Sequence, residues 1–236
     1  MSEVKMYEGK SKAVYETDDP SVCIIKYKDT ATAFNGEKKE DLSGKGRINA
    51  EISNMLYRYL EKNGVKTHLV EIIDDITVKV KKADIVLVEV IIRNVAAGSF
   101  SKKYGVPEGT ALKNTVVEFS YKSDELGDPL LNDSHITAIG LATQEELDYM
   151  TSQALKVNQL LSDLFAGIGI RLIDFKLEFG RCGNEILLCD EISPDSCRFW
   201  DAKTNEKLDK DIFRRDLGNL IDGYTNVLER LKSAIR

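Results

Sequence analysis

The first eighty residues alternate apolar and polar positions in short runs, a pattern typical of β-strands. Such runs occur at 6–8, 13–15, 22–27 and 76–80. Asp18-Asp19-Pro20 marks a turn between two of them. Residues 85–92 form a continuous apolar run that only Glu89 interrupts, which predicts a buried strand. A lone carboxylate in such a strand needs a partner, because an unpaired buried charge is costly.

Helical spacing of apolar residues begins further along the chain. One predicted helix has an apolar face at Ile48, Ile52, Met55, Leu56, Tyr59 and Leu60, with Gly64 at its end. Thr143 and Glu146 form a capping box that starts a second helix reaching Phe165, and a third apolar face runs from Phe213 to Leu231. The polar stretch 29–46 is expected to be a long loop of the kind that often acts as a lid or binding loop. Strands first and long helices later predict an α+β protein.

The strongest chemical signal is a strand-like run that contains Asp174, Lys176 and Glu178. Alternate side chains of a strand share a face, so these three are expected together, opposite a row of apolar residues. A glycine-containing turn and a second β-prone run, 185–189, predict a hairpin that brings Asp190 near them. Carboxylates and an ammonium in this arrangement suit a divalent cation and a phosphate group. A salt-bridged hairpin face exposed to solvent gives the same pattern.

Two other segments are candidates for binding an anion. Lys10 and Lys12 flank a predicted turn after Gly9, where backbone can come close to a phosphate, although a surface hairpin with solvated lysines has the same sequence. Arg93 ends the apolar strand and is followed by small residues up to Ser99. A helix that begins there could hold an anion at its N-terminus, and the alternative is a plain helix start with Ser99 as N-cap.

Composition narrows the possible functions. A chain of 236 residues is long enough for one large domain or two closely packed lobes. The net charge of −6 argues against broad nucleic-acid binding, although a few basic side chains in one cleft can still hold a small anion. We expect no membrane segment and a cytoplasmic location, because there is neither a long apolar run nor an apolar signal core. The four cysteines form no Cys-x-x-Cys pair and are expected to be unpaired thiols.

Several of these motifs together resemble the SAICAR synthetase (phosphoribosylaminoimidazole-succinocarboxamide synthase) family of purine biosynthesis. The run from Leu172 to Gly180 matches one family signature throughout, and the run from Val88 to Ser99 matches a second closely. Leu87 departs from the pattern, which usually has proline there. Further similar segments are Gly9-Lys10-Ser11-Lys12, Asp128-Pro129, Asp190-Glu191 and 193–201. The resemblance therefore covers essentially the whole chain.

The resemblance implies an ATP- and Mg²⁺-dependent ligase. Family members join carboxyaminoimidazole ribotide (CAIR) to L-aspartate and release SAICAR, ADP and phosphate. A carboxylate resists attack by an amine because oxide is a poor leaving group, so the use of ATP implies an acyl phosphate that the amine then displaces. The implied fold is a two-lobed α+β structure. A strand-rich N-terminal lobe, 1–86, covers the ATP phosphates, a mixed α/β C-terminal lobe, 87–236, carries the metal and ribotide sites, and the ATP cleft lies between them.

The resemblance also implies roles for individual residues. ATP is assigned to Gly9, Lys10, Ser11, Lys12, Val88 and Glu89, and Mg²⁺ to Glu178, Asp190 and Asp128. The ribotide is assigned to Arg93, Ser99 and Arg198. The catalytic candidates are Lys176, Asp174 and Asp195. Lys176 is expected to neutralise charge on the moving phosphoryl group, Asp174 to orient Lys176 or a substrate group, and Asp195 to contact the ribose or the imidazole amine. His135 is a candidate base, and a structural or gate role is the alternative.

Other functions use the same residue types. A phosphotransferase acting on a different small molecule needs the same lysines and acids, and a non-catalytic nucleotide-binding regulator could keep them. The run from Arg93 to Ser99 favours the ribotide ligase, and intact Lys12, Lys176 and Asp190 argue against a regulator. The expected partners are CAIR and L-aspartate, with no nucleic acid and no membrane. The resemblance also implies a homo-oligomer, with a dimer expected.

Overall fold

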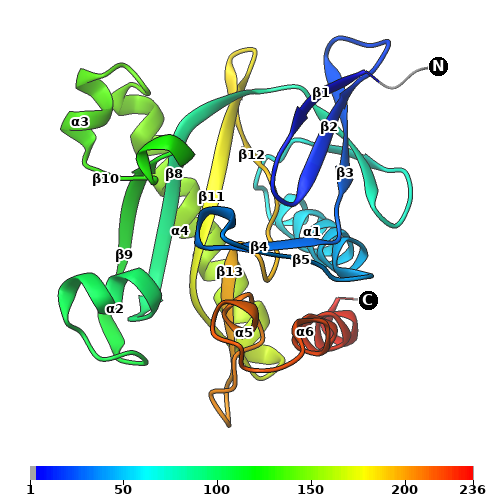
Figure 1. The fold of residues 1–236 in the computed structure, drawn as a ribbon. Helices are drawn as coiled ribbons and strands as arrows, with labels where there is room; N and C mark the ends of the chain where they lie inside the picture. Colours follow the sequence, from blue (N-terminus) through cyan, green and yellow to red (C-terminus); the bar gives the residue numbers. More distant parts are fainter. Residues whose placement is uncertain (1–3, 236) are drawn as a thin grey trace.

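Two antiparallel sheets dominate the computed structural model, which describes residues 4–235 (Figure 1). The first sheet has the strand order β1-β2-β3-β7-β6: β1 (Lys5–Glu8), β2 (Lys12–Glu16), β3 (Val22–Tyr27), β7 (Thr77–Lys81) and β6 (Leu69–Ile72). All four β-prone runs predicted in the first eighty residues therefore lie in this sheet. The expected α+β class is confirmed.

The second sheet contains the strands that carry most of the predicted site. Its order is β10-β9-β8-β11-β12, with β13 also paired to β11: β8 (Asp84–Val95), β9 (Ala111–Tyr121), β10 (Leu130–Leu131), β11 (Ile170–Cys182), β12 (Glu185–Cys189) and β13 (Cys197–Asp201). β8 pairs with one edge of β11, and β12 and β13 share the other. The predicted hairpin is confirmed, because β12 returns antiparallel to β11 with Glu178 opposite Cys189.

The structure contains the helices α1 (Lys45–Lys62), α2 (Gly98–Tyr104), α3 (Asp133–Ala138), α4 (Gln144–Gly167), α5 (Asp211–Arg214) and α6 (Leu220–Ala234). The helices predicted to end at Gly64 and to start at Thr143 are confirmed as α1 and α4, and α3 was not predicted. The capping box at Thr143 and Glu146 starts α4, with Thr143 N donating to the Glu146 carboxylate at 2.9 Å. The single helix predicted from Phe213 is wrong. Phe213 lies in α5, and the chain breaks at Gly218 (φ +143°) before α6 begins.

The loop predicted over residues 29–46 is also wrong in part. The structure forms a small hairpin there, from β4 (Thr30–Ala33) and β5 (Lys38–Asp41), joined by a short 3-10 turn. β4 is buried along its whole length, because its alanine and threonine side chains are small enough to pack on both faces. Another 3-10 turn, Asp124–Leu126, lies between β9 and β10.

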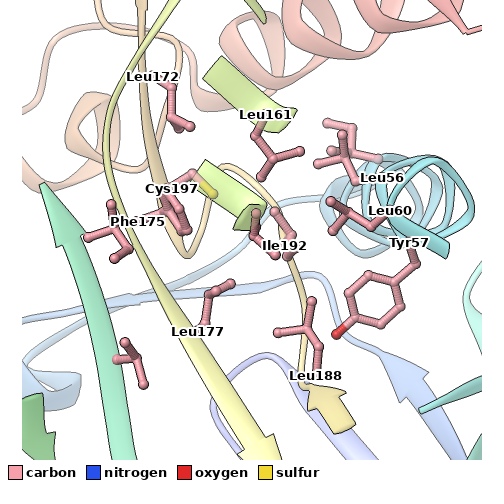
Figure 2. Close-up of a cluster of buried hydrophobic side chains, with 14 of the residues drawn as sticks. Leu56, Tyr57, Leu60, Leu161, Leu172, Phe175, Leu177, Leu188, Ile192 and Cys197 are labelled. Carbon is pink, nitrogen blue, oxygen red and sulfur yellow. The ribbon is translucent and has the colours of Figure 1, made fainter. Parts of the chain in front are cut away.

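The hydrophobic core lies between the helices and the two sheets. α4 packs along β11 and β8, and α1 packs against α6 and β3. Figure 2 shows Leu56, Tyr57 and Leu60 extending from α1 toward Leu188 and Ile192, so the first helix packs onto the segment that follows β12. Within the part of the chain that the structure describes, no helix is long and apolar enough to cross a membrane. All four cysteines are free thiols, as expected.

Strand β8 is less uniformly buried than its apolar sequence predicts. Val86, Val88 and Val90 are buried in the core, whereas Ile85 and Leu87 are 37% and 44% exposed. Alternate side chains of a strand point to opposite faces, so the first half of β8 presents one apolar row away from the core. That row lies at the cleft described next.

Candidate active site

A cleft of about 620 Å³ is lined by residues of both sheets. One part of its wall is apolar and consists of Val14, Cys23, Ile25, Val80, Ile85 and Leu87. The other part is charged and includes Lys10, Lys12, Glu89, Lys122, Lys176, Glu178, Asp190 and Glu191. An apolar wall next to a charged one fits a ligand with a flat apolar ring at one end and ionised groups at the other.

The glycine turn forms one side of the charged wall. Gly9 N donates to Lys12 O at 2.8 Å and closes the turn between β1 and β2. Lys10 pairs with Asp124 at 2.7 Å, and Lys12 forms an ion pair with Asp190 and lies 3.7 Å from Glu191. Burial alone lowers the pKa of the Lys12 ammonium, but the two carboxylates raise it above its usual value. Lys12 is therefore a fixed positive charge in the cleft.

Strand β11 supplies the opposite side of the charged wall. Lys176 donates to Glu89 on β8 and to Glu178 at 3.3 Å, and Lys122 donates to Glu178 at 2.6 Å. The partner predicted for Glu89 is thus Lys176, with Ser120 Oγ also donating to it at 3.2 Å. Burial lowers the pKa of Lys176, but Glu178 and Glu89 outweigh it and the net shift is upward. These side chains alternate in charge, from Glu89 through Lys176 and Glu178 to Lys122.

Asp190 and Glu191 lie where β12 ends. Asp190 has a left-handed backbone with φ +64°, which is uncommon for a non-glycine residue. Burial raises its pKa, but Lys12 and Lys176 hold it well below its usual range, so the carboxylate is ionised. Burial raises the pKa of Glu191, whose Oε2 is buried without a hydrogen-bond partner. Sequence reasoning did not assign Glu191 a role, although it adjoins Asp190.

The predicted metal ligands can be compared with this geometry. Among the described residues, no three side chains of the metal-binding types converge into a set that could hold an ion alone. Glu178, Asp190 and Asp128 all line the cleft, and the Asp128 carboxylate also accepts from Ser123 N at 2.9 Å. Mg²⁺ usually takes one or two carboxylates together with nucleotide phosphates. The donor set therefore fits a Mg²⁺ ion shared with a nucleotide.

A second charged cluster lies toward the other end of β11. Arg93 Nη1 and Arg198 Nη1 both donate to Asp174, at 3.1 Å and 2.9 Å, and Ser99 Oγ accepts from Arg93 at 3.2 Å. The structure thus brings together the residues assigned to the ribotide, although they do not line the 620 Å³ cleft. Asp174 is paired with these arginines. It makes no hydrogen bond or ion pair with Lys176 in the described structure, so orientation of Lys176 by Asp174 has no contact to support it. Ser99 is not an N-cap, because α2 begins at Gly98 after Ala97.

Asp195 occupies a buried network that the sequence did not reveal. Its carboxylate accepts from Lys45 Nζ at 2.5 Å and from Tyr224 Oη at 2.6 Å, and Lys210 Nζ is 3.9 Å away. Burial raises the pKa of Asp195, but Lys210 and Lys45 lower it to about 2. Asp195 and Lys210 both line the cleft, so this network connects the core to the site.

The remaining candidates differ in how they face the cleft. Ser11 lines it, with Oγ 3.5 Å from Glu191. Val88 does not line the cleft, because its side chain is buried in the core. Its neighbours Leu87 and Glu89 do line the cleft. His135 is exposed, and its Nδ1 accepts from Asn132 N at 3.5 Å in the capping box of α3. That contact favours the structural role for His135.

Fold and site together define a class: an α+β protein with a nucleotide-sized cleft between two antiparallel sheets, lined by a basic glycine turn and an acid-lysine strand. Comparisons with known proteins make the class specific. A family profile described as SAICAR synthetase matches residues 5–231. Phosphoribosylaminoimidazole-succinocarboxamide synthase from Lachnoclostridium phytofermentans is 58% identical over 227 residues, 96% of this chain and 97% of the relative. The synthase of the same name from Finegoldia magna is 54% identical over 97% of this chain and 99% of its own.

Solved structures agree with the sequence matches. The crystal structure of phosphoribosylaminoimidazole-succinocarboxamide synthase from Ehrlichia chaffeensis superposes with a TM-score of 0.95 at 44% identity, over 98% of this chain and 99% of that one. A SAICAR synthetase (Type-2) in complex with ADP gives a TM-score of 0.94 at 46% identity, over 98% of each chain. The chain belongs to the SAICAR synthetase family. It is therefore an enzyme, a ligase of purine biosynthesis.

Proposed function

We propose that this enzyme joins the carboxylate of CAIR to the amine of L-aspartate, using ATP and Mg²⁺, and releases SAICAR, ADP and phosphate. The observation that carries the proposal is the charged wall of the cleft, where Lys12, Lys176, Glu178 and Asp190 converge beside an apolar wall. ADP in the complex of the 46% identical SAICAR synthetase supports ATP as the nucleotide.

The apolar wall is proposed to take the adenine ring. Leu87 replaces the proline usual in the family, and its exposed side chain supplies apolar surface there. Val88 is proposed to contribute through its backbone, because its side chain is buried in the core. Gly9 and Ser11 bring backbone close to the phosphates, and Lys10 and Lys12 supply positive charge.

The charged wall is proposed to support phosphoryl transfer. A carboxylate oxygen of CAIR attacks the γ-phosphorus of ATP, ADP leaves, and an acyl phosphate results. Lys176 lies between Glu89 and Glu178 as a fixed cation and stabilises the negative charge that spreads over the moving group. Glu178 and Asp190 would hold Mg²⁺, which would supply further charge neutralisation on the phosphates, and Asp128 would assist a second metal ion near the CAIR carboxylate.

The second step forms the amide. The aspartate amine attacks the acyl carbon, phosphate leaves with the C–O bonding pair, and the nitrogen loses a proton. Arg93, Ser99 and Arg198 are proposed to bind the ribotide phosphate, since guanidinium groups make planar paired contacts with phosphate oxygens. Asp174 holds both guanidiniums in place, and Asp195 is proposed to contact the ribose or the imidazole amine.

Three further expectations belong to this proposal. We propose that the lobes divide near residue 86, within β8, which begins at Asp84 just after the first sheet ends at Lys81. A homodimeric assembly is retained as a prediction that rests on the family resemblance, and a cytoplasmic location as one that rests on the sequence pattern. Sedimentation velocity of the purified protein tests the assembly directly.

The proposed reaction is tested by measuring ADP release with ATP and Mg²⁺ while CAIR and L-aspartate are each omitted. Release that requires both, together with formation of the succinocarboxamide, is the expected result. Release with CAIR alone would indicate that an acyl phosphate forms and is hydrolysed. A folded protein that binds ATP but releases no ADP under any combination would contradict the ligase and favour a regulator or a phosphotransferase with another substrate.

A further inference from the structure

A row of polar side chains runs along the buried face of α1. Lys45, Asn49, Ser53 and Tyr57 follow one another at intervals of four residues, and none is more than 2% exposed. Residues four apart on a helix lie on the same face. Buried polar groups are costly unless they are bonded, so such a row on a core helix calls for partners along its whole length.

The partners lie in the segment 189–195, which follows β12 and carries Asp190, Glu191 and Asp195. Tyr57 Oη lies 2.7 Å from Cys189 O and 2.9 Å from Asp190 O. Ser53 Oγ accepts from Ile192 N at 3.2 Å, and Lys45 pairs with Asp195 at 2.5 Å. Three members of the row therefore bond in order to successive parts of one segment.

The contact that Tyr57 makes with this segment lies at Asp190, whose backbone conformation is unusual. Asp190 has φ +64°, and a left-handed non-glycine residue persists only where its surroundings hold it. Tyr57 bonds the carbonyl groups on both sides of the Asp190 N–Cα–C unit. Figure 2 shows the Tyr57 ring leaving α1 with its hydroxyl directed toward the strand that carries Leu188.

We propose that the hydroxyl of Tyr57 is a positioning group that fixes the Asp190 backbone, and so aims the Asp190 carboxylate for the metal-nucleotide complex. This inference rests on the proposed function, because it takes Asp190 as a metal ligand. Tyr57 does not line the cleft and is not a catalytic residue. Groups that orient metal ligands without touching the metal commonly change metal affinity about 10- to 100-fold when removed.

Two further features of its surroundings support the positioning role of Tyr57. Burial raises its pKa well above the usual value, so the hydroxyl keeps its one proton and shares it between the two carbonyl oxygens. His68 packs edge-on against the Tyr57 ring, with 5.7 Å between ring centroids, and His68 N donates to Leu188 O at 3.0 Å. The ring is thus held from a second direction by a segment that also bonds to β12.

The test compares Tyr57→Phe with the matched variant Tyr59→Phe. Tyr59 lies on the same helix, and its hydroxyl is 3.5 Å from Leu160 O in α4, away from the 189–195 segment. Mn²⁺ serves as the probe, and its binding to each protein in the presence of ADP is measured by electron paramagnetic resonance. Thermal unfolding of each variant reports any general loss of stability, and ADP affinity without metal is measured by calorimetry.

We expect Tyr57→Phe to weaken Mn²⁺ binding about tenfold or more in the ADP complex, with metal-free ADP affinity unchanged and Tyr59→Phe like the wild type. Equal Mn²⁺ affinity in all three proteins would overturn the positioning role and leave the proposed function intact. Equal weakening in both variants would also overturn it, because the effect would then follow general stability. Failure of the wild type itself to bind Mn²⁺ with ADP would instead reject Asp190 as a metal ligand, and the inference with it.

Discussion

Replacement of Gly98 by alanine tests the ribotide assignment through a single added methyl group. Gly98 has φ +52°, and a Cβ there would lie 2.4 Å from Arg198 Nη2 and 2.7 Å from its Cζ. The guanidinium cannot move aside freely, because it donates to Asp174 at 2.9 Å and to Asp211 at 2.9 Å. The methyl group therefore has to displace Arg198 from at least one of these carboxylates.

The size of the effect follows from the contacts that are lost. A hydrogen bond to a charged group contributes about 1.5–3 kcal/mol. The displaced guanidinium also leaves the position assigned to the ribotide phosphate. Loss of one charged hydrogen bond to that phosphate, at about 1.4 kcal/mol per tenfold change, is expected to raise the KM for CAIR at least about tenfold. The KM for ATP should change little, since Arg198 lies outside the cleft assigned to the nucleotide. Left-handed backbone adds a separate cost of about 1–2 kcal/mol to folding.

Gly105→Ala is the matched control for that backbone cost. Gly105 has φ +66°, and no atom lies within 4 Å of the position its Cβ would take. Steady-state kinetics with CAIR and ATP varied in turn, together with urea unfolding, separate the two effects. Gly98→Ala should lose more stability than Gly105→Ala, because it also displaces a charged hydrogen bond of Arg198, and only Gly98→Ala should raise the KM for CAIR. Equal KM values for CAIR in the two variants would refute the placement of Arg198 at the ribotide.

Three other predictions follow from the charged networks. Asp190→Asn should abolish turnover while leaving the circular dichroism spectrum unchanged; full activity would reject the metal assignment. Lys45→Met should lower the free energy of unfolding in urea by about 3 kcal/mol, because it leaves the buried Asp195 carboxylate without its nearest cation, and added Asp195→Asn should recover part of that loss. Burial and Lys12 lower the pKa of His68 from 6.5 to about 4 in the folded protein. As the pH falls, the unfolded protein therefore protonates His68 before the folded protein does, and the free energy of unfolding decreases between pH 6.5 and pH 4. Wild type should therefore lose up to about 3 kcal/mol more than His68→Asn between pH 7 and pH 4, and parallel pH profiles would contradict this.

The sequence determined much of the local structure around the site. Alternation at Asp174, Lys176 and Glu178 predicted a strand with a charged row, and β11 has it. The glycine-containing turn after it predicted the return of β12 toward Asp190. These features depend on neighbours in the chain, where the period of two reports which side chains share a face. The conformation of β4 and β5 was missed because β4 contains only threonine and alanine and β5 only charged residues, so neither has the large apolar side chains that marked the other strands.

Partners distant in the chain were decided only by the tertiary structure. Lys45 and Asp195 are 150 positions apart, and Arg93 and Arg198 reach Asp174 from different strands. With 33 basic and 39 acidic side chains, the sequence alone is compatible with a very large number of such pairings. The sequence contains the polar row of α1 at Lys45, Asn49, Ser53 and Tyr57, but it does not show that this row is buried or that it bonds to the segment 189–195.

The physical reason is the same in each case. Periodicity states which face of an element is buried, and it carries no information about what packs against that face. Val88 and Leu87 show the limit, since both belong to one apolar run and only the packing of β8 between β9 and β11 decides which faces the core. The sequence thus determined the elements and the residue types for phosphate and metal chemistry, and the packing of α1 and the sheets decided which of them meet.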